Sequence, residues 1–134
     1  MEKTFLMIKP EMVEAGKQGE IIDLLIKNRF TVRGMKQFRF DRERAGEFYG
    51  IHREKPFFPD LVRYITSGDV VGIELERENA VKLLRELVGA TDPAGARPGT
   101  IRYMYGSSLQ TNAVHASDSP ESAEKELAIV FAGD

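Results

Sequence analysis

Short apolar runs typical of β-strands alternate along this chain with segments whose apolar residues recur at helical spacing. The expected strands are residues 4–8, 30–40, 70–75 and 112–116. The expected helices are residues 20–29, 42–49, 60–65 and 78–88, with a short one at 100–105 and a last one capped by Ser119 with Pro120 at its first position. This order excludes an all-helical bundle and an all-β sandwich.

We therefore predict an α+β fold: a four-stranded, mostly antiparallel sheet with helices packed on it, for which ferredoxin-like βαββαβ is the closest simple template. A length of 134 residues fits a single domain, residues 1–134. In the second strand Phe30, Val32, Phe38 and Phe40 share one parity, which predicts one buried face. For the last segment a strand at 127–131 competes with the helix, which we expect to end at Gly133.

The charge balance and residue usage exclude several classes of protein. With 19 basic and 21 acidic residues the net charge is −2, which argues against nucleic acid as the main ligand but leaves room for a local basic site. The absence of cysteine excludes disulfides, Cys-ligated zinc and thiolate catalysis, and two histidines are too few for a His-only metal site, so no protein-built metal site is predicted. The apolar run Phe5–Ile8 is too short for a signal peptide or a membrane span, so we expect a cytoplasmic protein.

Glycine-rich phosphate-binding motifs are missing from the sequence. There is no G-x-x-x-x-G-K-[ST], no protein-kinase glycine loop and no G-x-G-x-x-G. A protein of this sequence that handled nucleotides would neutralise phosphate with Lys and Arg side chains. Residues 89–111 hold four of the twelve glycines and two of the six prolines, and a loop of that length in a compact domain is typically functional.

The most distinctive string is Asn112-Ala113-Val114-His115-Ala116-Ser117-Asp118-Ser119. His115 lies among small and hydroxyl residues just before a capped helix, and on a strand it would point opposite to Val114. A neutral imidazole nitrogen is a good nucleophile towards phosphorus at neutral pH. The residues alone leave open a second interpretation, a partly buried histidine that holds a turn.

The pattern N-x-x-H-A-S-D-S resembles the signature of nucleoside diphosphate kinases. Further blocks resemble that family in the same order, from residue 4 to about residue 131: Lys9-Pro10, Phe48-Tyr49, Pro56-Phe57-Phe58, Gly89-Ala90-Thr91-Asp92-Pro93, Pro98-Gly99-Thr100-Ile101-Arg102 and Glu121-Ser122-Ala123-Glu124-Lys125-Glu126. The resemblance implies a ping-pong enzyme in which His115 takes the γ-phosphate of a nucleoside triphosphate and passes it to a nucleoside diphosphate. It also implies Mg²⁺ that is carried by the nucleotide phosphates.

The resemblance implies a role for each matching residue. Beside His115, the catalytic group comprises Glu126, which would accept from the ring nitrogen that is not phosphorylated, Lys9, which would contact the transferring phosphate, and Tyr49. Ser117 and Ser122 would support the hydrogen bonds of Glu126. Substrate binding would fall to Lys9, Phe57, Leu61, Arg85, Thr91, Arg102 and Asn112: the arginines and Thr91 for phosphate, Phe57 and Leu61 for the base, and Asn112 for the ribose.

The chain departs from the family pattern at Glu11-Met12, at Asp92 and at Tyr103-Met104-Tyr105. Members of the family are usually homo-oligomers, which leaves tetramer and hexamer both open. Two rival functions are a non-catalytic nucleotide-binding protein of the same fold and an unrelated ferredoxin-like interaction module. The presence of His115 disfavours the non-catalytic protein. An unrelated interaction module would have no reason to keep together Lys9, Arg85, Arg102 and Asn112. No catalytic role is expected for His52.

Overall fold

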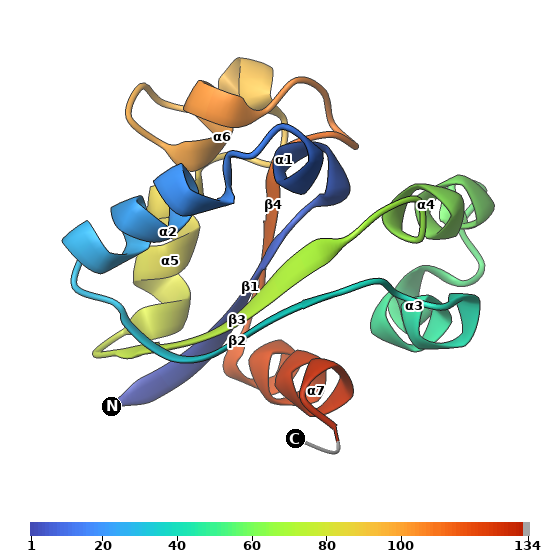
Figure 1. Cartoon of the computed structure of the whole chain (residues 1–134), viewed down its shortest axis with the longest axis horizontal. Coiled ribbons are helices and arrows are strands. Elements are labelled where there is room, and N and C mark those ends of the chain that lie inside the picture. Colours follow the sequence, from blue (N-terminus) through green and yellow to red (C-terminus); the bar gives the residue numbers. More distant parts are fainter. Residues whose placement is uncertain (133–134) are drawn as a thin grey trace.

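The computed structural model describes residues 1–132 and contains one four-stranded antiparallel sheet in the order β2-β3-β1-β4. Strands β1 (Glu2–Ile8) and β3 (Val70–Arg77) are central, whereas β2 (Thr31–Phe38) and β4 (Val114–Ala116) form the two edges (Figure 1). This confirms the expected fold class. The four central residues Phe5–Ile8 are fully buried because helices cover both faces of the sheet.

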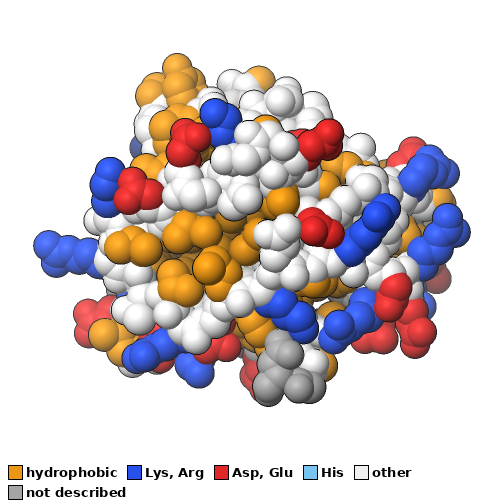
Figure 2. Space-filling model, in the orientation of Figure 1, with side chains coloured by type: hydrophobic (Ala, Val, Ile, Leu, Met, Phe, Trp, Pro, Cys, Tyr) orange, Lys and Arg blue, Asp and Glu red, His pale blue; other side chains and the backbone are white. Residues whose placement is uncertain are grey.

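Two groups of helices build two hydrophobic cores, one on each face of the sheet (Figure 1). Helices α2 (Gln18–Lys27) and α5 (Ala80–Val88) cover one face, on the side where α1 (Pro10–Glu14) and α6 (Ile101–Tyr105) also lie. Helices α3 (Arg42–Phe48), α4 (Phe58–Ile65) and α7 (Pro120–Val130) contribute to the core on the opposite face. Short 3₁₀ turns occupy Gly50–His52 and Pro93–Gly95. On the visible surface, charged side chains of both signs surround a group of apolar ones (Figure 2).

The prediction that the apolar residues of the second strand all lie on one buried face is wrong. Val32 pairs with Leu75 and Gly34 with the adjacent Glu74, so Arg33 is an extra residue, a β-bulge. Because side chains alternate along a strand, one extra residue moves everything after it to the other face. Val32 therefore packs on the core under α2 and α5, and Phe38 on the core under α3 and α7.

Local capping signals placed the later helices well. Asp41 accepts a hydrogen bond from the backbone N–H of Arg44, and Ser119 from that of Ser122, with Pro120 in the first turn of α7. The segment from Pro120 is therefore a helix rather than a strand; its expected end at Gly133 lies outside the described residues. Helix α1 was not predicted, because Pro10 was interpreted only as the end of a strand although proline also suits the first turn of a helix.

Candidate active site

His115 is placed by the short edge strand β4, in which it lies opposite Met7 of β1. Val114 and Ala116 point into the core under α2 and α5, so alternation along the strand directs the His115 ring to the other side of the sheet. There Phe48 and Tyr49 approach the ring edge-on, with centroids 5.1 and 6.3 Å from it. Burial raises the pKa of the Tyr49 phenol, and the Glu126 carboxylate adds to the shift, so Tyr49 stays neutral.

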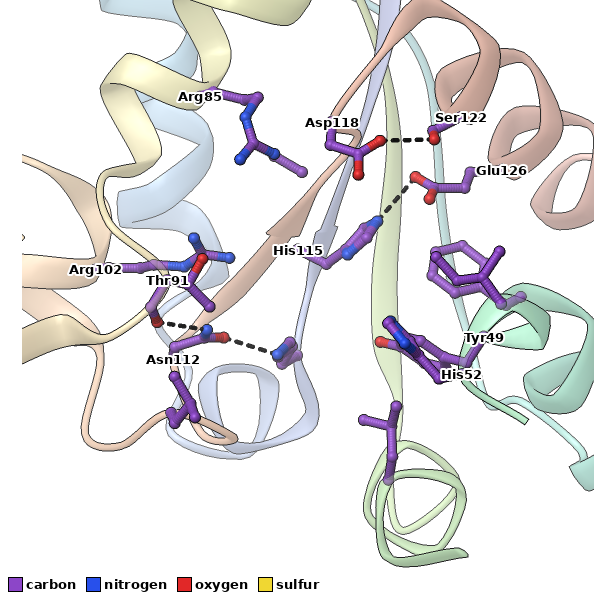
Figure 3. Close-up of a pocket in the computed structure, with 16 residues that line it drawn as sticks. Tyr49, His52, Arg85, Thr91, Arg102, Asn112, His115, Asp118, Ser122 and Glu126 are labelled. Carbon is purple, nitrogen blue, oxygen red and sulfur yellow. Dashed lines mark hydrogen bonds and ion pairs between the residues drawn. The ribbon is translucent and has the colours of Figure 1, made fainter. Parts of the chain in front are cut away.

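A buried carboxylate from α7 holds the His115 ring. Nε2 of His115 lies 2.8 Å from Oε1 of Glu126 (Figure 3). The Ser117 hydroxyl donates to the same oxygen at 2.7 Å. Glu126 reaches this position because it lies on the sheet-facing side of α7 together with Ala123 and Val130. Because an ionised carboxylate only accepts hydrogen bonds, the neutral form of the His115 ring has its proton on Nε2 and its lone pair on Nδ1.

Ser122 does not belong to the hydrogen bonds of Glu126, contrary to the expectation. Ser122 lies one helical turn before Glu126, but its hydroxyl donates to Oδ1 of Asp118 at 2.7 Å (Figure 3). The reason is helix capping, because Ser122 lies in the first turn of α7, beside the Ser119 cap. The hydrogen bond from Ser122, assisted by the charge of Arg85, lowers the pKa of the Asp118 carboxyl.

Lys9 brings a buried amine to the pocket from the end of β1. Its Nζ donates to Oδ1 of Asn112 at 2.7 Å and to the carbonyl of Gln110 at 3.2 Å. The Asn112 amide in turn donates to the carbonyl of Thr91 at 2.9 Å, which ties the loop after α5 to the start of β4 (Figure 3). Burial lowers the pKa of Lys9 to about 8, with Glu11 opposing the shift and Arg102 adding to it.

Two arginines complete the positive side of the pocket. Arg102 of α6 donates to the carbonyls of Gly89 and Val114 at 3.1 and 3.0 Å, while its buried Nε has no acceptor in residues 1–132. Burial lowers the pKa of Arg102 to about 10, with the charge of Arg85 adding to the shift. Arg85 of α5 points into the pocket, and no ion pair of its guanidinium is found in the described part of the chain (Figure 3).

These side chains line one cavity of about 330 Å³. Of the residues predicted from the sequence, the structure brings together Lys9, Tyr49, Leu61, Arg85, Thr91, Arg102, Asn112, His115, Ser122 and Glu126. Ser117 lies behind the wall and acts on Glu126 only. Phe57 does not line the cavity; it is about half exposed, and its ring lies 5.4 Å from that of His52, which does.

Sequence reasoning missed several residues of the wall: Phe48, Ile51, His52, Leu109, Ala116 and Asp118. Asp118 had a usable signal, since a carboxylate four residues before a first-turn serine suits a hydrogen bond to it. Ile51 and Leu109 had none, because isolated apolar residues in loops are common. His52 lies between the rings of Tyr49 and Phe57, which explains its presence at the cavity.

Residues 1–132 contain no group of three or more His, Asp or Glu side chains that could hold a metal ion. No helix in the same residues has both the length and the apolar character needed to cross a bilayer.

Comparison with known proteins adds independent information on this fold and cavity. The family model for nucleoside diphosphate kinase matches residues 2–134. A nucleoside diphosphate kinase of Aquifex aeolicus is 46% identical over 136 residues, covering 99% of this chain and 96% of the relative. One from Pelotomaculum thermopropionicum is 51% identical over 134 residues, covering 100% and 90%.

Solved structures agree with this likeness. A crystal structure of the Aquifex aeolicus nucleoside diphosphate kinase superposes with a TM-score of 0.95 at 47% identity, covering 98% of this chain and 96% of that one. A halophilic nucleoside diphosphate kinase from Halobacterium salinarum in complex with CDP gives 0.94 at 42% identity, covering 99% and 88%. The chain belongs to the nucleoside diphosphate kinase family of phosphotransferases, which move phosphate between nucleoside tri- and diphosphates through a phosphohistidine.

Proposed function

We propose that His115 is the nucleophile of the phosphoryl transfer. Its Nδ1 lone pair attacks the γ-phosphorus of a nucleoside triphosphate, the bond from that phosphorus to the bridging oxygen breaks, and the nucleoside diphosphate leaves. A second nucleoside diphosphate then takes the phosphate from Nδ1 by the reverse chemistry. The single observation that supports this most strongly is the 2.8 Å contact between Glu126 and Nε2, because it leaves the other nitrogen free for the reaction.

Glu126 acts on the reaction through the ring. A phosphorylated imidazole draws electron density from Nε2–H, and a carboxylate acceptor stabilises the positive charge that develops there. Ser117, which donates to the same carboxylate oxygen, fixes its position. Tyr49 and Phe48, both in T-shaped contact with the ring, restrict its rotation.

The three cations of the cavity neutralise and orient the phosphates. Lys9 remains mostly protonated at neutral pH, because its pKa of about 8 lies above that pH. Arg102 and Arg85 line the cavity, and the N–H groups of their guanidinium ends offer donors to phosphate oxygens. Phosphoryl transfer depends mainly on such positioning and charge stabilisation.

The nucleoside is bound at the mouth of the cavity. Phe57 and Leu61 provide apolar contact to the base, and a flat aromatic ring accepts any base. The Thr91 hydroxyl contacts phosphate. Asn112 already accepts from Lys9 and donates to Thr91, so we assign its contact with the ribose to the second lone pair of Oδ1 or the second N–H of Nδ2.

Mg²⁺ fits this cavity as an ion carried by the nucleotide. The cavity wall contains two carboxylates: Glu126 is engaged with His115, and only Asp118 is left to reach the hydration shell of an ion. When bound, Mg²⁺ neutralises charge on the phosphate oxygens.

We further propose that the protein is a homo-oligomer, either a tetramer or a hexamer. Ile26 and Met35, each more than half exposed, offer apolar surface for contacts between subunits. Size-exclusion chromatography with light scattering measures the molar mass of the assembly and so decides between tetramer and hexamer.

Labelling with nucleoside triphosphate tests the proposal. The protein is incubated with Mg·ATP labelled on the γ-phosphate, without acceptor. We expect an acid-labile, alkali-stable phosphoprotein that GDP discharges and that is absent in His115→Ala. A folded protein that takes no label would refute the proposal, and so would a His115→Ala variant that labels normally. A label that GDP does not remove would refute the second half of the proposed reaction, the transfer from the phosphohistidine to a nucleoside diphosphate.

A further inference from the structure

Glu11 joins three segments around the active site without lining the cavity. It lies in the first turn of α1, two residues after Lys9. Its Oε1 accepts a hydrogen bond from the Tyr64 hydroxyl of α4, and its Oε2 accepts the backbone N–H of Ala113 at 3.2 Å. Both carboxylate oxygens are therefore held, and the position of the negative charge is fixed.

The contact with Ala113 is made at an unusual backbone conformation. Ala113 has a φ of +78°, which a residue with a Cβ rarely adopts, and it is fully buried. Its carbonyl accepts the backbone N–H of Lys9 at 2.9 Å. The segment that leads from Asn112 to His115 is thus bound on one side by the Glu11 side chain and on the other by the Lys9 backbone.

The Lys9 amine lacks a charged hydrogen-bond partner in the described residues. Its two acceptors, the Asn112 amide oxygen and the Gln110 carbonyl, are neutral. Its Nζ also lies over the face of the Tyr64 ring, 5.8 Å from the ring centroid. A buried ammonium with neutral partners tends to lose its proton.

The charged and titratable groups around this amine come from every neighbouring element. Arg102 of α6 disfavours the protonated amine, and Glu11 of α1 favours it. Tyr64 of α4 stays neutral, because burial and the hydrogen bond to Glu11 raise its pKa. The remaining groups lie across the cavity: Tyr49, His52, Arg85, His115, Asp118 and Glu126.

We infer that Glu11 is a positioning residue of the phosphoryl transfer: its carboxylate, fixed by Tyr64 and Ala113, is the counter-charge that keeps the Lys9 amine protonated beside Arg102. The inference rests on the proposed function, in which a protonated Lys9 holds the transferring phosphate. Burial lowers the pKa of Lys9 to about 8 even though the Glu11 carboxylate opposes the shift. Removing that carboxylate therefore lowers the pKa of Lys9 further.

The test is the pH dependence of kcat/KM in Glu11→Gln, with Glu14→Gln as the matched control. Glu14 lies on the same helix, is exposed and makes no hydrogen bond or ion pair in the described residues, so its variant changes the net charge equally. A base whose pKa falls loses its proton at lower pH. We therefore expect the kcat/KM of Glu11→Gln to lie within about twofold of that of the unchanged protein at about pH 6.5. At about pH 9 we expect it to be about tenfold lower. Glu11→Asp, which keeps the charge, restores most of the alkaline activity.

Two outcomes would overturn the inference: a loss in Glu11→Gln of equal size at every pH, which is the mark of a purely structural role, or no loss at all. Activity near about pH 6.5 reports that the variant is folded, and circular dichroism gives a second check. The γ-phosphate labelling of the unchanged protein separates this inference from the proposed function. If the unchanged protein labels and the two pH profiles run parallel, only the role of Glu11 fails; if it does not label, the proposed function fails.

Discussion

Replacing Glu126 gives the sharpest measure of how the ring of His115 is activated. The Glu126 carboxylate accepts from both His115 and Ser117 at 2.8 and 2.7 Å in a buried setting. Hydrogen bonds to a charged group contribute about 1.5–3 kcal/mol, so Glu126→Ala should slow phosphorylation of His115 by about tenfold to 150-fold. Glu126→Gln keeps an acceptor oxygen but loses the charge, and a neutral hydrogen bond is about half as strong, so its loss should be about tenfold or less.

The assay is single-turnover transfer from γ-labelled ATP, followed by rapid quench, with nucleotide binding measured separately. The dissociation constant should change little in both variants, because Glu126 touches the ring rather than the nucleotide. Glu124→Gln is the matched control, since Glu124 is exposed on the same helix without a hydrogen-bond or ion-pair partner in the described residues. Thermal unfolding checks that the variants are folded. Normal phosphorylation in Glu126→Ala, or weaker nucleotide binding with normal transfer of bound nucleotide, would contradict the reasoning.

Two further predictions concern packing and base binding. In Gly72→Ala the new Cβ would lie 2.9 Å from Val130 and 3.1 Å from Phe5, so the free energy of unfolding, measured with denaturant, should fall by about 1–3 kcal/mol. In Gly19→Ala the new Cβ lies in open space on α2, so the free energy of unfolding should rise by about 0.5–1 kcal/mol. Equal effects of the two substitutions would refute the packing argument. Phe57→Ala should raise KM for every nucleoside triphosphate by about tenfold and leave single-turnover transfer at saturation unchanged, since stacking contributes about 1–3 kcal/mol per base; an unchanged KM would remove Phe57 from the binding site.

The candidate site was largely predictable because its residues occur in short strings with recognisable chemistry. The run from Asn112 to Ser119 contains the nucleophile, the asparagine that holds Lys9, and the cap that begins α7. Phe57 marks the limit of that approach. The sequence placed it beside the other binding residues, whereas in the structure it lies outside the cavity wall.

The partners of individual hydroxyls were less predictable. The family resemblance made both Ser117, nine residues before Glu126, and Ser122, four residues before it, plausible partners of that carboxylate. Only the start of α7 decides between them, because it gives the first-turn serine to Asp118 and leaves Ser117 to Glu126. A hydroxyl takes whichever acceptor the backbone places nearest, and this is decided by the fold.

The sequence by itself determined the order of the strands and of every α-helix except α1, the sheet class, the helix caps and the family, since these depend on local spacing and on strings of a few residues. The tertiary structure decided what depends on distance between remote segments. It placed the β-bulge at Arg33, which sends Val32 and Phe38 to opposite cores, and it brought Glu11 to Ala113 across the fold. It also buried Lys9 among neutral acceptors, so the charge state of that amine depends on the Glu11 carboxylate, to which the sequence alone assigned no role. Pattern reasoning reads neighbours along the chain, whereas burial and charge act between neighbours in space.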